Sequence, residues 1–247
     1  VKSQKIEYPI TENNLSNTEN IQFSNLIDGT MINLFFHNNK WIMSTRSDIG
    51  CLNKWNNKTN FKNMFEESIG NNNFYDYLST NFTYSFLLLN KNNRNISYIE
   101  NNCVILIEVY NKSTFEKMDN IRATMNEEIY INNSVHTLDD LKINFDSIEA
   151  INNYFLSSNF NFKGINININ NNRLTLINPN FIKVKKLCIN TTNLHEKYIY
   201  LKKNKNIKEY LIYFPEVGQK FLNYSNQFTI MINELHDNYI KKHIKKE

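Results

Sequence analysis

The residues of this chain that are best suited to chemistry are lysines, which fall into three runs. The first spans residues 183–186, the second residues 202–208 and the third residues 241–246. Ammonium groups grouped in this way neutralise phosphate oxygens, although a solvated surface explains most charge runs. The net charge of +4 permits binding of nucleic acid without requiring it.

The motifs of several enzyme classes are absent from the sequence. It contains no GxxxxGK[ST] or GxGxxG phosphate-binding loop, no HExxH zinc motif and no GxSxG nucleophile motif. Of the five histidines, His236 and His243 stand seven positions apart, about two helical turns, which is too far to share a metal. The three cysteines lack CxxC spacing, and we expect reduced thiols. We therefore predict no metal site.

Several segments that must position any site are visible as periodic patterns. Apolar, β-prone runs separated by polar turns predict strands at 31–36, 41–45, 84–89, 104–110, 165–169 and 173–177, of which the first two and the last two form hairpins. Helical spacing of apolar residues predicts helices at 61–69, 137–156, 198–203, 208–214 and 218–246. Since the strands come first and helices close the chain, we expect an α+β fold with an antiparallel sheet core.

We expect this chain to divide into a domain at residues 1–190 and a C-terminal helical segment at residues 191–247, packed on it. No apolar run approaches the roughly 18–20 residues of a membrane span, and no secretory signal pattern opens the sequence. These features predict a cytoplasmic protein without membrane contact.

Asparagine is the most unusual component, at 48 of 247 residues. Ile, Lys, Tyr and Phe are also common, and all of these residues have AT-rich codons. The bias therefore indicates an AT-rich genome, such as that of a protist or of a large DNA virus. A viral origin would place the protein in the host cytoplasm. Individual asparagines carry little functional information for this reason.

Five short segments occur in the order found in one superfamily of enzymes. They are Asp28-Gly29, Ser44-Thr45-Arg46, Tyr84-Ser85-Phe86 with Asn93-Arg94, Lys163-Gly164 and Lys183-Val184-Lys185. In this order the chain resembles the covalent nucleotidyltransferases, and most of all RNA ligases of the phage T4 ligase-1 type and their giant-virus relatives. The likeness extends from about residue 25 to about residue 240 and implies their antiparallel sheet core with C-terminal helices.

The resemblance also implies a mechanism that this chain does not support. In the family, a lysine two positions before Asp-Gly attacks the α-phosphate of ATP or GTP, and carboxylates hold a divalent metal. Here the position of that lysine is Leu26, and the positions of two carboxylates correspond to Leu87 and Lys163. We therefore expect no catalytic residue, no required cofactor and a catalytically degenerate member of the family.

The resemblance further implies residues that would bind the ligand. The predicted nucleotide- and phosphate-binding residues are Asp28, Arg46, Lys163, Lys183 and Lys185, and the predicted base-stacking residues are Trp41, Trp55, Tyr84 and Phe86. Some have a structural alternative, since Asp28 also suits a turn, and Trp41 and Phe86 also suit a sheet core. Lys183 and Lys185 lie at a predicted strand end, where alternate residues share a face.

Three functions follow from these expectations. The first is a non-catalytic protein that binds a nucleotide, an RNA 5′ end or the mRNA cap. The second is an active ATP-dependent RNA ligase or capping-type nucleotidyltransferase that uses a displaced lysine. The third is an interaction module that contacts other proteins through its C-terminal helix.

Overall fold

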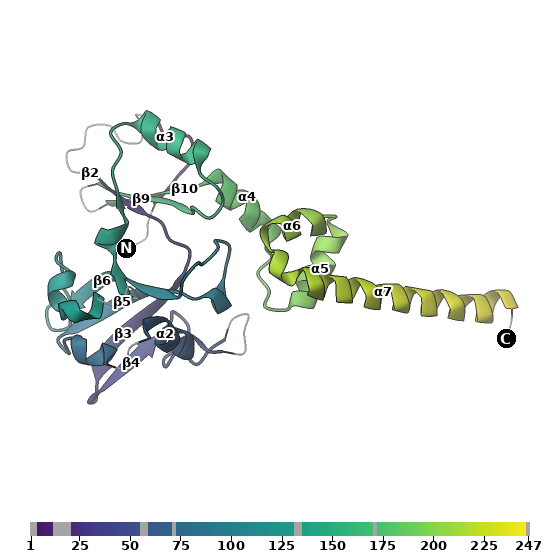
Figure 1. Cartoon of the computed structure of the whole chain (residues 1–247), viewed down its shortest axis with the longest axis horizontal. Helices are drawn as coiled ribbons and strands as arrows, with labels where there is room; N and C mark the ends of the chain where they lie inside the picture. The colour runs from purple at the N-terminus through teal and green to yellow at the C-terminus, as the bar shows by residue number, and fades with distance from the viewer. Residues whose placement is uncertain are drawn as a thin grey trace. The chain divides into compact units, whose positions relative to one another are not determined.

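A computed structural model describes residues 4–11, 21–54, 59–70, 73–130, 135–169 and 172–245 of the chain (Figure 1). The chain divides into two compact units, Val1–Lys183 (unit 1) and Val184–Glu247 (unit 2). Unit 1 contains all the strands of the described residues, arranged in two five-stranded sheets. Unit 2 is helical.

Sheet B of unit 1 has the strand order β4-β3-β5-β6-β7. Its strands are β3 (Thr30–His37), β4 (Lys40–Ser44), β5 (Phe82–Leu89), β6 (Cys103–Asn111) and β7 (Val135–Thr137). All neighbours are antiparallel except β6 and β7, which are parallel. The predicted first hairpin is confirmed, and Asn38 and Asn39 turn it with positive φ angles of 49° and 58°. Asparagine tolerates this left-handed conformation, which two-residue hairpin turns favour.

The helix α2 (Phe61–Ile69) packs against sheet B as its apolar spacing predicted. The Asn60 side chain caps its first turn by accepting a hydrogen bond from the Asn63 amide. Phe65 of this helix lies edge-on to Phe86 of β5, with ring centres 5.6 Å apart. Rings of this kind share the core of sheet B with a larger number of aliphatic side chains.

Sheet A has the strand order β1-β10-β9-β2-β8. Its strands are β1 (Gln4–Ile6), β2 (Ile21–Asn25), β8 (Lys142–Ile143), β9 (Gly164–Ile169) and β10 (Asn172–Ile177), and only β1 and β10 form a parallel pair within it. The isoleucines of β9 are buried and its asparagines are partly exposed, as their alternation predicted. The helix α3 (Ile148–Ser157) packs on this sheet through Ile151 and Phe155. The fold is α+β, with antiparallel sheets that each gain one parallel pair at an edge.

The helix predicted at residues 137–156 is wrong in its first half. Residues there complete β7, form a 3₁₀ turn (η5, Leu138–Leu141) and pair as β8 before α3 begins. The amide and the hydroxyl of Thr137 both donate to the Asp140 carboxylate, at 2.7 and 3.0 Å, and this local turn competes with a helix. The helix instead starts at Ser147, whose hydroxyl oxygen accepts a hydrogen bond from the Ala150 amide.

The strand end predicted around Lys183 and Lys185 is also wrong, because these residues belong to the helix α4 (Pro179–Leu187). Pro179 occupies its first position, where a missing amide hydrogen costs nothing. The Asn178 side chain accepts a hydrogen bond from the Asn180 amide at 2.9 Å and so helps start the helix. Residues two apart on a helix point about 200° apart, so the two lysines do not share a face.

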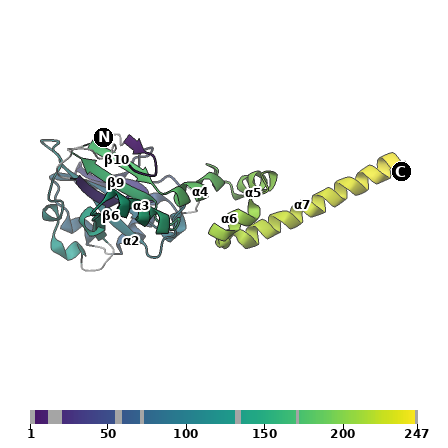
Figure 2. The same ribbon diagram turned by 90° about the horizontal axis from the view of Figure 1, so that it is seen from above.

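Unit 2 consists of α5 (Leu194–Lys203), α6 (Ile207–Tyr213) and α7 (Gly218–Tyr239), and α7 continues as a π-helical segment, η7 (Ile240–Lys245). The predicted C-terminal helices are therefore confirmed. Tyr198 of α5 packs against Phe221 and Phe228 of α7, with ring centres 5.3 and 5.8 Å apart. The helix α7 continues well past α5 and α6 (Figures 1 and 2).

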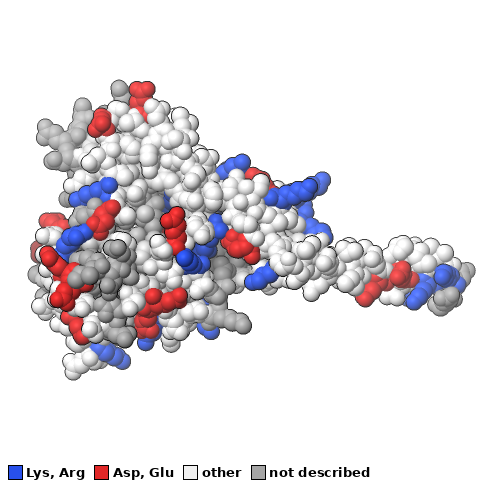
Figure 3. All heavy atoms as spheres, in the orientation of Figure 1, with Lys and Arg blue, Asp and Glu red and all other residues white. Residues whose placement is uncertain are grey.

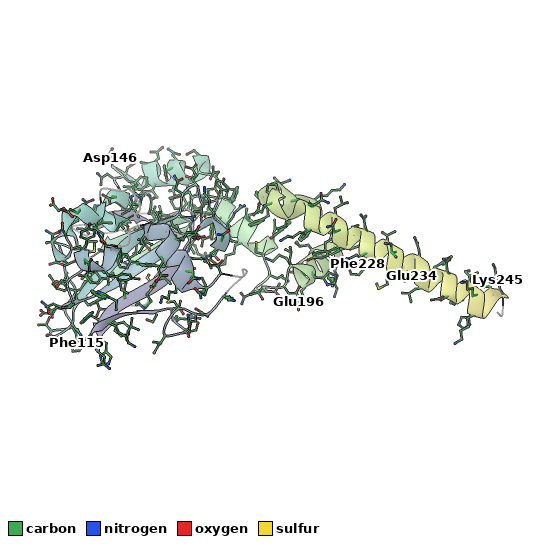
Figure 4. The ribbon with its side chains drawn as sticks, turned by 60° about the horizontal axis from the view of Figure 1, so that its bottom comes forward. Phe115, Asp146, Glu196, Phe228, Glu234 and Lys245 are labelled. Carbon is green, nitrogen blue, oxygen red and sulfur yellow. The ribbon has the colours of Figure 1, made fainter. Side chains whose placement is uncertain are left out.

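Beyond Phe228, α7 carries an exposed apolar stripe that includes Met231, Leu235 and Tyr239 (Figure 4 labels the neighbouring Glu234). Acidic and then basic side chains follow toward the end of the helix (Figure 3).

Among the helices that the structure describes, none combines the length and the apolar character that a membrane span requires. The remaining short 3₁₀ turns are η1 (Phe74–Tyr77), η2 (Lys91–Asn93), η3 (Arg122–Thr124), η4 (Glu127–Tyr130) and η6 (Pro215–Val217).

Candidate functional site

A cavity of about 410 Å³ in unit 1 is lined by residues from both sheets. Asn25 at the end of β2 and Lys163 just before β9 belong to the sheet A side. Leu89 at the end of β5 and Cys103 at the start of β6 belong to the sheet B side. A cavity of this volume suits a small molecule or part of a larger one.

The predicted residues Asp28 and Lys163 meet in the wall of this cavity. The Lys163 ammonium lies 3.3 Å from the Asp28 carboxylate and donates a second hydrogen bond to the Ile27 carbonyl at 3.2 Å. The Asp28 side chain is 8% exposed and also accepts hydrogen bonds from the amides of Ile96 and Ser97, at 2.9 and 3.3 Å. Asp28 therefore fixes the loop after β5 and orients the lysine, instead of capping its own turn.

Leu26, the position of the lysine in the resemblance, also lines the cavity. Its amide donates to the Gly164 carbonyl at 2.8 Å, which joins the segment after β2 to the start of β9. Gly164 has a φ of 150°, and a side chain there would collide with the Leu176 carbonyl on β10. The hydrogen bond holds the Leu26 segment beside the Lys163 segment, and the missing side chain of Gly164 lets β9 lie close to β10.

Two buried oxygen atoms belong to residues of the same wall and have no hydrogen-bond partner among the described residues. They are Oγ of Ser97, a residue that is 8% exposed, and Oδ1 of Asn25. Buried polar atoms are normally paired, and an unpaired one costs about 1–3 kcal/mol. Both atoms are almost completely shielded, so a molecule in the cavity would reach them only if the wall shifted.

The wall also contains residues that sequence reasoning missed. Tyr98 and Tyr154, 60% and 41% exposed, are aromatic, and His136 and Glu100 are ionisable. Arg94 lies over the Tyr98 ring at 5.7 Å and donates to the Ile96 carbonyl, so it supports the loop that carries Tyr98. Neither periodicity nor motif singles out these residues, because they come together only through the packing of two sheets.

The other predicted phosphate-binding residues are not among those that line this cavity. Arg46 is exposed after the end of β4, and Lys183 and Lys185 are exposed on α4. Of the five predicted residues, the structure therefore brings together Asp28 and Lys163. Burial raises the pKa of the nearby Cys103 thiol, which keeps this wall residue neutral near pH 7.

The predicted stacking residues that the structure describes lie away from the cavity wall. Tyr84 and Phe86 are fully buried in the core of sheet B, and the Tyr84 hydroxyl donates to the Thr124 carbonyl at 2.9 Å. Trp41 packs on the same core, 6.1 Å from the Tyr84 ring. These positions correspond to the core-filling alternative. Trp55 lies outside the described residues.

No protein-family model matches the sequence, and neither does any curated protein. Among solved structures, a putative ATP-dependent DNA ligase from Aquifex aeolicus is similar, with a TM-score of 0.50 and 13% identity over 92% of this chain and 65% of that chain. The chain has a ligase-type nucleotidyltransferase fold. This agrees with the fold that the sequence resemblance implies and does not single out the T4-type or giant-virus members.

Two structures of Naegleria gruberi RNA ligase mutants, one apo and one with ATP and Mn, are similar at lower scores. Their TM-scores are 0.45 and 0.44, both at 12% identity over 67% of this chain. The chain spans about half the length of these RNA ligases, 51% and 52%.

The divalent metal implied by the resemblance does not fit the residues of this chain. The part of the chain that the structure describes holds no group of three or more His, Cys, Asp or Glu side chains arranged to bind a metal ion. In the cavity, Asp28 is already occupied by two amides and an ammonium. Lys163 places a positive charge where the resemblance implies a carboxylate ligand.

Proposed function

We propose that unit 1 binds a nucleotide or the 5′ end of an RNA, the mRNA cap included, and that it does not transfer the nucleotide. The observation that carries this proposal is the cavity at the ends of both sheets of a ligase-type fold, with Leu26 in its wall. A leucine side chain has no lone pair with which to attack phosphorus. Loss of a nucleophile lowers enzymatic rates by several orders of magnitude.

Binding assays test this proposal directly. The full chain is titrated with GMP, AMP, 5′-phosphorylated RNA, 5′-hydroxyl RNA and capped RNA, and binding is followed by calorimetry. Affinity for nucleotides or for one type of 5′ end supports the proposal. Absence of affinity for every probe would overturn it.

The amine of Lys163 favours a second candidate, an active nucleotidyltransferase that uses a displaced lysine. Lys163 lines the same cavity as Leu26, and Asp28 lies close enough to accept its proton. In such a step the lysine nitrogen bonds to the α-phosphorus, the bond to the β-phosphate oxygen breaks, pyrophosphate leaves and the nitrogen loses a proton.

Radiolabelled ATP and GTP with Mg²⁺ or Mn²⁺ separate the two candidates. An acid-labile labelled protein supports the enzyme, and its loss in Lys163→Arg, which keeps the charge, assigns the label to Lys163. An unlabelled wild-type chain excludes the second candidate. The role of the C-terminal helix in contacts with other proteins stays a prediction.

A further inference from the structure

The charges of the cavity wall indicate which part of a nucleotide it accepts. Lys163 is the one lysine or arginine among the described wall residues, whereas Asp28 and Glu100 are both acidic. With His136 neutral, one positive and two negative charges leave a formal charge of −1 on the wall. A polyphosphate, which carries several negative charges, is poorly matched to such a wall.

The lysine is itself largely engaged by the protein. Two of its three ammonium hydrogens point to the Ile27 carbonyl and to Asp28, so one remains for a ligand. The carboxylate of Asp28 cancels most of its charge at short range. One donor of this kind suits a carbonyl group on a base better than a chain of phosphates.

The other wall residues have the chemistry of base recognition. Tyr98 and Tyr154 are partly exposed rings, which suit stacking on a flat base. Glu100 is exposed, with no ion pair or hydrogen bond to its side chain in the described part of the chain.

We propose that the cavity receives the base of the ligand, with the phosphates directed to solvent, and that it prefers a purine made cationic by N7-methylation. This inference rests on the proposed function and names its ligand class. A cationic ring gains from aromatic stacking and from the unpaired Glu100 carboxylate, whereas a neutral purine gains only from the former. Since the phosphates remain in water, binding needs no divalent metal.

The experiment compares N7-methyl-GMP, GMP, GTP and AMP by calorimetry with the full chain, in EDTA and in Mg²⁺, at neutral pH, where the methyl-bearing ring of the base carries its positive charge. We expect the methylated nucleotide to bind about tenfold more tightly than GMP, equivalent to about 1.4 kcal/mol. We expect GTP and GMP to bind within about threefold of each other, in EDTA as in Mg²⁺.

Variants assign the preference to the wall. Glu100→Gln removes the carboxylate at an exposed position and is expected to reduce the tenfold preference to about threefold, with GMP binding unchanged. Glu116→Gln is the matched control, because Glu116 is exposed and does not line the cavity. Tyr98→Ala is expected to weaken both nucleotides about tenfold, as for the loss of one stacked ring. Thermal unfolding of each variant without ligand verifies that it is folded.

The outcomes separate this inference from the proposed function. Three outcomes would overturn the inference and leave nucleotide binding intact. They are equal affinity for methylated and unmethylated GMP, a preference that Glu100→Gln leaves at its full wild-type size, and binding that needs Mg²⁺ or strengthens steeply from GMP to GTP. Absence of binding for all four probes would overturn both.

Discussion

The Asp28 carboxylate contacts two backbone amides and one ammonium group in unit 1, and replacing it by alanine tests how the cavity wall is held. Asp28→Ala removes the acceptor of two backbone amides, Ile96 and Ser97, and the partner of the Lys163 ammonium. The carboxylate is 8% exposed, so water replaces few of these bonds.

The expected loss follows from these contacts. A buried donor without an acceptor costs about 1–3 kcal/mol, and an ion pair to a partly exposed lysine contributes up to about 1 kcal/mol. The Lys163 side chain is 25% exposed and the Ser97 contact is long, at 3.3 Å, so values near the lower ends apply. We expect Asp28→Ala to lower the free energy of unfolding by about 3 kcal/mol, and Lys163→Met by about 1 kcal/mol because Asp28 keeps both amides.

Urea unfolding followed by tryptophan fluorescence measures this effect in unit 1 alone, because both tryptophans of the chain, Trp41 and Trp55, lie in that unit. The double variant is expected to lose about 1 kcal/mol less than the two single losses together, since the ion pair is then counted once. Lys62→Met, at an exposed helical ion pair with Glu66, is the control and should change stability by less than about 0.5 kcal/mol. An Asp28→Ala variant as stable as this control would refute the reasoning.

Three further predictions concern unit 1. Burial alone would raise the pKa of Glu108, but Lys117, the Tyr110 hydroxyl and Arg173 together hold that pKa below its ordinary value. The carboxylate therefore stabilises the fold fully above the unfolded-state pKa, and this contribution is lost as the pH falls through the lower folded-state pKa. Glu108→Gln should flatten the acid limb of a urea-stability profile, and an unchanged profile would contradict this. Burial, with a smaller contribution from a nearby carboxylate, raises the pKa of the Cys51 thiol to about 11, so iodoacetamide at neutral pH should leave Cys51 unmodified by mass spectrometry until urea unfolds the chain. Gly164→Ala should destabilise unit 1 by about 2–3 kcal/mol in the same fluorescence assay, because the new methyl group meets the Leu176 carbonyl; wild-type stability would show that the strands can separate there.

The strands and the terminal helices were predictable from the sequence because their patterns are local. The isoleucines of β9 and the asparagine turn of the first hairpin specify strands without help from the rest of the chain. The helix predicted for the segment after Val135 is wrong because the apolar spacing there is helical while hydrogen bonds between Thr137 and Asp140 close a turn. A hydrogen bond between side chain and backbone leaves no trace in hydrophobic periodicity.

The candidate site was predictable only in part, for a similar reason. Asp28 and Lys163 belong to ordered motifs and do meet, at 3.3 Å across 135 positions of sequence. Tyr98, Glu100 and Tyr154 belong to no motif and reach the cavity through the packing of two sheets. Lys183 was predicted at the end of a strand, where it would share a face with Lys185. It lies in the helix α4 instead, which Asn178 and Pro179 help to start, so the two lysines do not share a face.

The pairing of Asp28 with Lys163 also bears on the evolutionary history of such a protein. A carboxylate introduced at position 163 alone would lie beside the buried Asp28 carboxylate, where the ammonium now lies 3.3 Å away. Like charges so close destabilise each other unless one binds a proton. A carboxylate at position 163 would therefore need a second substitution nearby to supply the lost positive charge, so selection acting on one change at a time would keep the aspartate and the lysine together.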